Sequence, residues 1–192
     1  GKIVNIQTIY PSGEKRFMKG GRITGCYYPI AVKGDIKGDE SDRIVLCEGL
    51  ATGKQLRADT GLPVVVCFFA GNIEPVAVHR RARYGLAQFI IAGDNDQWVM
   101  REQIKASRFK DIDLKTIPGD DPRWTEWRQA GYLWNPGAEA AAKAANRVGG
   151  RVTLPFAGSA FQHPDRPLPL ASKPTDFNDL SLIAGPDAVR AA

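Results

Sequence analysis

The sequence predicts an α/β fold in which a mainly parallel sheet lies between layers of helices. From residue 44 onward, short and continuously apolar runs alternate with longer segments of helical character. Strands that are apolar on both faces are typical of a parallel sheet covered by helices on each side. The first 30 residues differ, because short alternating runs separated by Pro and Gly are typical of antiparallel strands. We therefore expect a small N-terminal antiparallel β-rich subdomain followed by a larger α/β domain.

The β-rich subdomain is predicted to form a three-stranded meander. Its alternating runs cover residues 3–10, 15–18 and 22–30, and Pro11 and the Gly20–Gly21 pair lie in the turns. Residues 32–42 are rich in glycine and charge, which is typical of an exposed linker. We place the boundary there, which gives one domain at 1–42 and a second at 43–192.

The second domain is predicted to contain four strands, at 44–47, 64–69, 88–92 and 151–154. Helices are expected at 52–60, 75–84, 136–148 and 178–184, because glycine follows the first three and Pro136 suits a first helical position. An insertion at 97–134 contains all four tryptophans, which we expect to close a small core, with base stacking as the alternative. Residues 156–174 are rich in proline and are predicted to form a loop.

Composition excludes several classes of protein. Of the 192 residues, 43% are apolar and 24% are charged, as in ordinary globular domains. The longest apolar runs are far shorter than the ~20 residues of a membrane span, so we expect no membrane contact and a cytoplasmic location. Three cysteines without CxxC spacing exclude a zinc finger or a disulfide framework. The chain begins with Gly1, from which we expect a fragment of a longer protein.

Acidic residues follow two of the predicted strands. Glu48 comes directly after the strand at 44–47, and Asp94 and Asp96 come after the strand at 88–92. Ligands of open α/β sheets bind outside the carboxyl ends of the strands, and residues two apart on a strand share a face. Carboxylates without nearby His or Cys favour Mg²⁺ or Mn²⁺. The alternative is that these residues cap the following helices.

A third acidic segment contains Asp176 and Asp179, which could return over the same site or cap the last helix. Together the three segments resemble the acidic motifs of the Toprim domain, which is found in bacterial primases, topoisomerases and some nucleases. Primases of plasmids, integrative elements and phages are the most similar. The resemblance to them also includes residues 13–22, Ala70–Gly71–Asn72 and Asn135–Pro136–Gly137. It covers roughly residues 12–182 and departs at the long insertion after Asp96.

This resemblance implies a Toprim-like fold and metal-dependent nucleotidyl transfer. Asp94 and Asp96 would hold Mg²⁺ or Mn²⁺, Glu48 would be a general base or a metal ligand, and Asp176 would be a further ligand. Basic residues of the N-terminal turns are expected to contact nucleic-acid phosphates, and they are Lys15, Arg16, Lys19 and Arg22. Lys54, near a helix start, and Asn72, in a turn shared with the primases, are further candidates. The basic run at 79–83 is predicted to be a solvated helix face.

We therefore expect the catalytic core fragment of a DNA primase of a mobile element, which need not be active alone. Its expected partners are a single-stranded DNA template, NTPs, the RNA primer, and further domains of its parent or a helicase. One alternative is a Toprim nuclease or topoisomerase fragment. The other is a non-catalytic module that binds single-stranded DNA and in which the acidic residues are structural.

Overall fold

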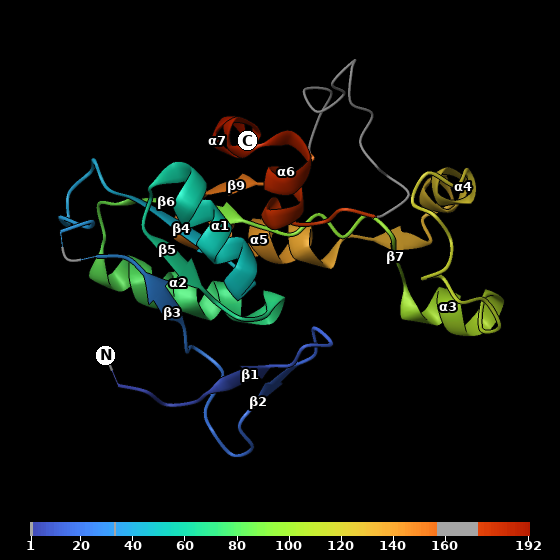
Figure 1. Ribbon diagram of the computed structural model, residues 1–192, viewed down its shortest axis with the longest axis horizontal. Helices are drawn as coiled ribbons and strands as arrows, with labels where there is room; N and C mark the ends of the chain where they lie inside the picture. The colour runs from blue at the N-terminus through green and yellow to red at the C-terminus, as the bar shows by residue number, and fades with distance from the viewer. Residues whose placement is uncertain (1, 33, 157–172) are drawn as a thin grey trace.

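The central sheet confirms the predicted α/β class. A computed structural model describes residues 2–32, 34–156 and 173–192. Five strands lie in the order β3, β5, β4, β6, β9 (Figure 1), and β3 alone of these runs antiparallel to its neighbour. Their bounds are Tyr28–Ile30 for β3, Arg43–Cys47 for β4, Val64–Val66 for β5, Gln88–Ala92 for β6 and Arg151–Thr153 for β9.

Helices cover both faces of this sheet, as the continuously apolar strands predict. On one face lie α2 (Ile73–Arg83) and α5 (Pro136–Val148), which pack on Ile44 and Leu46 of β4. On the other face lie α1 (Leu50–Thr60), α6 (Phe177–Ala184) and α7 (Pro186–Ala191). There Val45 and Cys47 of β4 contribute to the second core. Successive residues of a strand point to opposite faces, so a strand buried on both must be apolar throughout.

Several element ends differ from the prediction. The strand predicted at 64–69 ends at Val66, because Phe68 adopts a left-handed backbone with φ of 74°. A short 3-10 turn, η1 (Ala70–Asn72), then leads directly into α2. Helix α7 is not among the predicted elements, and it begins at a proline two residues after α6 ends. Most of the loop predicted at 156–174 lies outside the described residues.

The N-terminal region contains a small antiparallel sheet, but the predicted three-stranded meander is wrong. Strands β1 (Gln7–Ile9) and β2 (Lys15–Phe17) form a hairpin, which Figure 1 shows outside the main sheet. The third expected strand, β3, pairs instead with β5. Ile30 packs there on the core beneath α1, and this burial favours the main sheet over the hairpin. The division into domains at residue 42 stays a prediction.

The insertion forms a separate small core, which confirms the structural role expected for Trp98, Trp124 and Trp127 but not for the exposed Trp134. It contains β7 (Val99–Met100), α3 (Glu102–Arg108), α4 (Arg123–Gln129) and β8 (Leu133–Trp134), and β7 pairs antiparallel with β8. Trp124 and Trp127 are buried and meet edge to face, with ring centroids 5.1 Å apart. Lys173 lies over the Trp124 ring at 4.6 Å and donates to the Leu114 carbonyl oxygen at 2.7 Å. The insertion therefore contacts the segment that leads to Asp176.

None of the helices in the described part of the chain is long and apolar enough to cross a membrane.

Replacing Trp124 with Ala is expected to destabilise the insertion by roughly 3–5 kcal/mol, because the ring is almost fully buried. Thermal denaturation and the rate of proteolysis within residues 97–134 measure the change. Trp134→Ala is the matched control, because that ring is 37% exposed and should cost much less. Equal melting temperatures and cleavage rates for the two variants would show that the aromatic cluster does not hold the insertion together.

Candidate active site

The structure brings the predicted acidic residues together at the carboxyl end of the sheet. Strands β4 and β6 are neighbours in parallel register, with Cys47 opposite Ala92, so Glu48 and the Asp94–Asp96 segment leave the sheet side by side. Asp176 reaches the same place from the start of α6. The four carboxylates lie close enough that Glu48, Asp176 and Asp96 each raise the pKa of Asp94. We call these four residues the acidic cluster.

Burial and mutual repulsion raise the pKa values of carboxylates in the acidic cluster. Burial is the largest cause that raises the pKa of Asp94 to about 8, and the three neighbouring carboxylates add to it. Burial also raises the pKa of Glu48, followed by the charge of Asp96. Lys15 of the hairpin opposes the shift at both Glu48 and Asp94. The hairpin therefore supplies positive charge to a site with a surplus of negative charge.

Asp94 also has an unsatisfied polar atom. Its Oδ1 is buried and has no hydrogen-bond partner among the described residues. Buried carboxylate oxygens without partners are costly in a folded protein. This oxygen therefore suits a ligand that supplies a positive charge or a donor.

The N-terminus of α5 holds Asp96. The Gly137 backbone N–H donates to Asp96 Oδ2 at 3.2 Å, which lowers the pKa of Asp96 against the larger effect of burial. Asn135 Oδ1 accepts from the Asp96 backbone N–H at 2.9 Å and also caps the helix by accepting from Ala138 N–H. A helix N-terminus carries partial positive charge, which stabilises this carboxylate.

Two asparagines that the sequence analysis did not select organise the loop. The Asn135 amide donates to Asn95 Oδ1 at 2.7 Å, and the buried Asn95 amide donates to the Pro155 carbonyl oxygen at 2.8 Å. The Asn95 backbone N–H donates to the Thr175 carbonyl oxygen at 2.7 Å. Asn95 therefore connects the end of β6 to the third acidic segment. The Asn–Pro–Gly helix start was the available signal for Asn135.

Asp176 and Asp179 cap α6, so the capping alternative is confirmed for both. Asp176 Oδ1 accepts from the Asp179 N–H at 2.8 Å, and Asp179 Oδ2 accepts from the Thr175 N–H at 2.8 Å. Thr52 of α1 donates its hydroxyl to Asp176 Oδ2 at 3.0 Å. The capping alternative is wrong for Glu48, because the N-cap of α1 is Gly49.

The other predicted phosphate-binding residues differ in their surroundings, and their contact with phosphate stays a prediction. Arg16 pairs with Glu14 at 2.7 Å, and Arg22 donates to Cys26 Sγ at 3.4 Å. Lys19 and Lys54 are exposed.

Asn72 is fully buried. It accepts from the Gly25 N–H and donates to the carbonyl oxygens of Cys26 and Cys67. These bonds anchor the N-terminal segment to the end of β5. The structure thus gives Asn72 a positioning role.

The donor chemistry of the acidic cluster fits a hard cation, but the described residues do not form a closed metal cage. No group of three or more His, Cys, Asp or Glu side chains among them is arranged to hold a metal ion. Mg²⁺ is commonly held by one or two carboxylates, waters and substrate phosphates rather than by a cage of protein ligands alone. The unpartnered Asp94 oxygen and the repulsion around it are consistent with such an open site.

The protonation of Asp94 should make stability depend on pH. Its pKa is about 8 in the folded chain against a usual 3.8, so the folded state binds the extra proton between these values. The free energy of unfolding should therefore fall as pH rises from about 4 to about 8. Asp94→Asn should reduce this fall and stabilise the chain at pH 8 by on the order of a few kcal/mol.

Denaturant unfolding at several pH values, without divalent cations, measures this dependence. The matched control is Asp111→Asn, because Asp111 is exposed in the insertion. That variant should follow the wild-type pH profile. If Asp94→Asn also followed it, Asp94 would not be the group that holds the proton.

Known proteins of similar sequence include two from Escherichia coli. No protein-family model matches this chain, and no solved structure matches it. One Escherichia coli protein named DNA primase TraC is 29% identical over 177 residues, which is 92% of this chain and 10% of that protein. A second Escherichia coli protein of that name is 28% identical over 156 residues, 81% of this chain and 12% of that protein. The chain therefore spans about a tenth of the length of these relatives, and most of it is related to a segment of two DNA primases.

Proposed function

We propose that this chain is part of the catalytic core of a DNA primase, which joins NTPs into an RNA primer on single-stranded DNA. The observation that carries the proposal is the acidic cluster, formed where three segments of a primase-related chain meet. Its position outside the carboxyl ends of parallel strands is where α/β folds bind their ligands. The names of the two relatives favour a primase over the nuclease and topoisomerase alternatives.

Primer synthesis requires a 3′-hydroxyl to attack the α-phosphorus of an NTP, with pyrophosphate as the leaving group. Asp94 and Asp96 would hold Mg²⁺ or Mn²⁺, and Asp176 would act on it directly or through water. The chemistry that the cation supplies when bound is charge neutralisation at the phosphates and activation of the hydroxyl. Glu48 would be a second metal ligand or the group that accepts the hydroxyl proton, and its raised pKa suits the latter role.

Lys15 is the basic residue that best fits a role in this reaction. It acts electrostatically on both Glu48 and Asp94 from the β1–β2 hairpin. A triphosphate or a primer terminus entering the acidic cluster would therefore meet this ammonium group. Phosphates are commonly neutralised by lysine in this way.

Substitutions in the acidic cluster should abolish primer synthesis. Glu48→Gln or Asp94→Asn is expected to lower the rate about 100-fold or more, because general base and charge-stabilising groups contribute on that scale. The assay measures oligonucleotides made from NTPs on single-stranded DNA with Mg²⁺ or Mn²⁺. It is run with the 192-residue chain.

The matched control for these variants is Glu40→Gln, because Glu40 is exposed in the segment before β4. It should synthesise primers at the wild-type rate. Undiminished synthesis by Glu48→Gln and Asp94→Asn would contradict the assigned site. DNA cleavage without added NTPs would instead support the nuclease alternative.

Cation binding gives a test that does not depend on activity. Mn²⁺ titration should detect a site that the double substitution of Asp94 and Asp96 by Asn removes. Because the pKa of Asp94 is about 8, binding must displace its proton, so affinity should rise by up to about tenfold per pH unit below 8. Equal Mn²⁺ binding by the double variant, or binding that is independent of pH, would place the cation elsewhere.

A further inference from the structure

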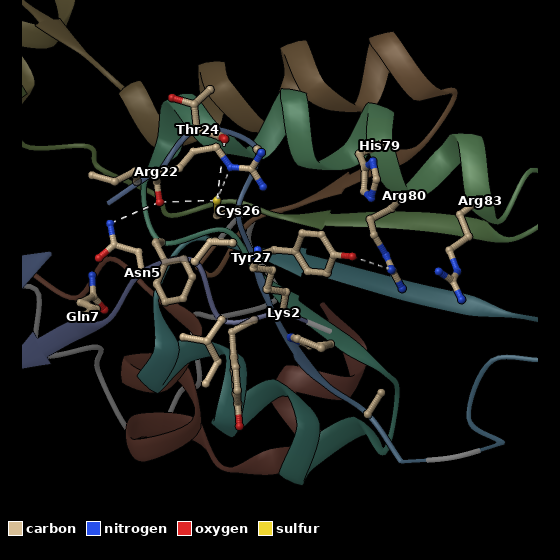
Figure 2. A pocket seen from close by; sticks show the side chains of 18 of the residues that line it. Lys2, Asn5, Gln7, Arg22, Thr24, Cys26, Tyr27, His79, Arg80 and Arg83 are labelled. Carbon is tan, nitrogen blue, oxygen red and sulfur yellow. Dashed lines mark hydrogen bonds between the residues drawn. The ribbon is translucent and has the colours of Figure 1, made fainter. Parts of the chain in front are cut away.

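A large pocket lies between α2 and the N-terminal segment of the chain. It has a volume of about 1220 Å³, and its walls come from α2, residues 2–7, residues 22–32 and residues 34–36. Figure 2 shows His79, Arg80 and Arg83 projecting from α2, with Tyr27 opposite. We call this the α2 pocket. Neither the proposed chemistry nor the acidic cluster uses it.

The α2 pocket has a strongly positive lining. No Asp or Glu of the described residues lines it, whereas its basic side chains are Lys2, Arg22, His79, Arg80 and Arg83. A concave surface lined by charge of one sign concentrates the electric field and attracts ligands of the opposite sign. The lining therefore favours an anionic ligand.

Arg80 strengthens this conclusion, because its charge is buried without a counterion. The residue is 5% exposed, so the solvated helix face predicted for residues 79–83 is wrong for Arg80, whereas His79 and Arg83 are exposed as predicted. Its guanidinium lies 5.1 Å from the Tyr27 ring centroid and 4.5 Å from that of Tyr84. Nη1 donates to the Tyr27 hydroxyl at 3.2 Å, whereas Nε has no hydrogen-bond partner among the described residues.

No carboxylate in the described chain forms an ion pair with Arg80, as the five pairs there involve other residues. Burial of an uncompensated guanidinium is costly. The neighbouring Arg81 shows the contrast. It donates to the carbonyl oxygens of Val148, Gly85 and Ala87 and so has a structural role. An anion in the α2 pocket would supply the negative charge and the hydrogen-bond acceptor that the Arg80 guanidinium lacks.

The size and aromatic content of the α2 pocket indicate the chemical class of the anion that it would bind. Its volume exceeds the range of about 300–1,000 Å³ typical of small-molecule sites. Tyr28 lines it and is 51% exposed, so its ring is accessible for stacking. Cations that neutralise phosphates beside aromatic rings that stack bases are typical of sites for single-stranded nucleic acid. The pocket therefore suits several linked nucleotides better than one nucleotide.

One end of the α2 pocket adjoins the acidic cluster. Phe17 and Phe68 line this end, and their rings meet edge to face with centroids 5.5 Å apart. The Phe68 N–H donates to the Glu48 carbonyl oxygen at 2.7 Å. A strand that leaves the pocket here would continue toward the acidic cluster.

We propose that the α2 pocket is a separate binding site for single-stranded DNA, with Arg80 and Arg83 contacting its phosphates. This inference rests on the proposed function for the identity of the strand. The site differs from the acidic cluster in requiring neither a divalent cation nor an NTP.

Binding of fluorescently labelled dT12 to the 192-residue chain tests the proposal by anisotropy, in EDTA and without NTPs. Arg80→Gln should weaken binding tenfold or more, and Arg83→Ala should weaken it about three- to tenfold. For each lost phosphate contact, the slope of log K against log salt should fall by about 0.7. The matched control is Arg147→Ala, because Arg147 is exposed on α5 outside the pocket, and it should bind as the wild type does.

Binding by both variants that equals that of Arg147→Ala would overturn the proposal. Circular dichroism checks folding, and if Arg80→Gln does not fold, the double substitution of His79 and Arg83 by Ala replaces it. ATP competing as effectively as dT12 would show a site for single nucleotides instead. Equal competition by a poly-glutamate peptide would show a site for acidic protein segments.

The same assay separates this proposal from the proposed function. Glu48→Gln and Asp94→Asn should bind dT12 normally even if they make no primers. If these two variants bind dT12 normally and Arg83→Ala binds it more weakly, the result supports a DNA site in the α2 pocket. This holds whatever the outcome of the primer-synthesis assay. Loss of binding in Glu48→Gln would instead place the DNA at the acidic cluster and overturn a separate site.

Discussion

Repulsion among the four carboxylates at one end of the sheet is the constraint on which the surrounding structure depends. Without compensation, like charges this close together would push apart the three segments that carry Glu48, Asp94 with Asp96, and Asp176. The fold opposes this with two helix N-termini, because α5 donates an N–H to Asp96 and α6 is capped by Asp176. The Asn95–Asn135 pair and the bond from Asn95 to Thr175 then fix the loops to one another. The hydrogen bonds of these asparagines therefore hold the loops that carry the carboxylates in place.

Two glycines set how closely these parts approach. A Cβ at Gly137 would lie 2.4 Å from the Asp94 carbonyl oxygen, and one at Gly93 would lie 2.7 Å from the Ala141 Cβ. Both positions therefore require glycine, because backbone and helix surface would otherwise clash. The distance from α5 to the end of β6 follows from this packing. The N–H of Gly137 consequently reaches Asp96 without any side chain between them.

The sequence predicts those features that depend on local pattern. The run from Ile44 to Cys47 is apolar throughout because it is buried on both faces, so it identifies both a strand and the acidic residue at its end. Contacts between segments that are distant in the chain leave no local pattern in the sequence. The pairing of β3 with β5 and the burial of Arg80 both depend on where the N-terminal segment lies. Asn135 meets Asn95 across an insertion, and no periodicity reports that contact.

The insertion is joined to the rest of the chain at its two ends, and it also contacts Lys173. Its two ends meet where the Asp96 N–H donates to Asn135, so its length is free to change without moving them apart. Lys173, by contrast, binds the insertion through Leu114 and Trp124, three residues before Asp176. The insertion therefore supports the third acidic segment. Residues 97–134 and 173–176 are expected to change together among related chains, and an alignment of such chains would display this covariation.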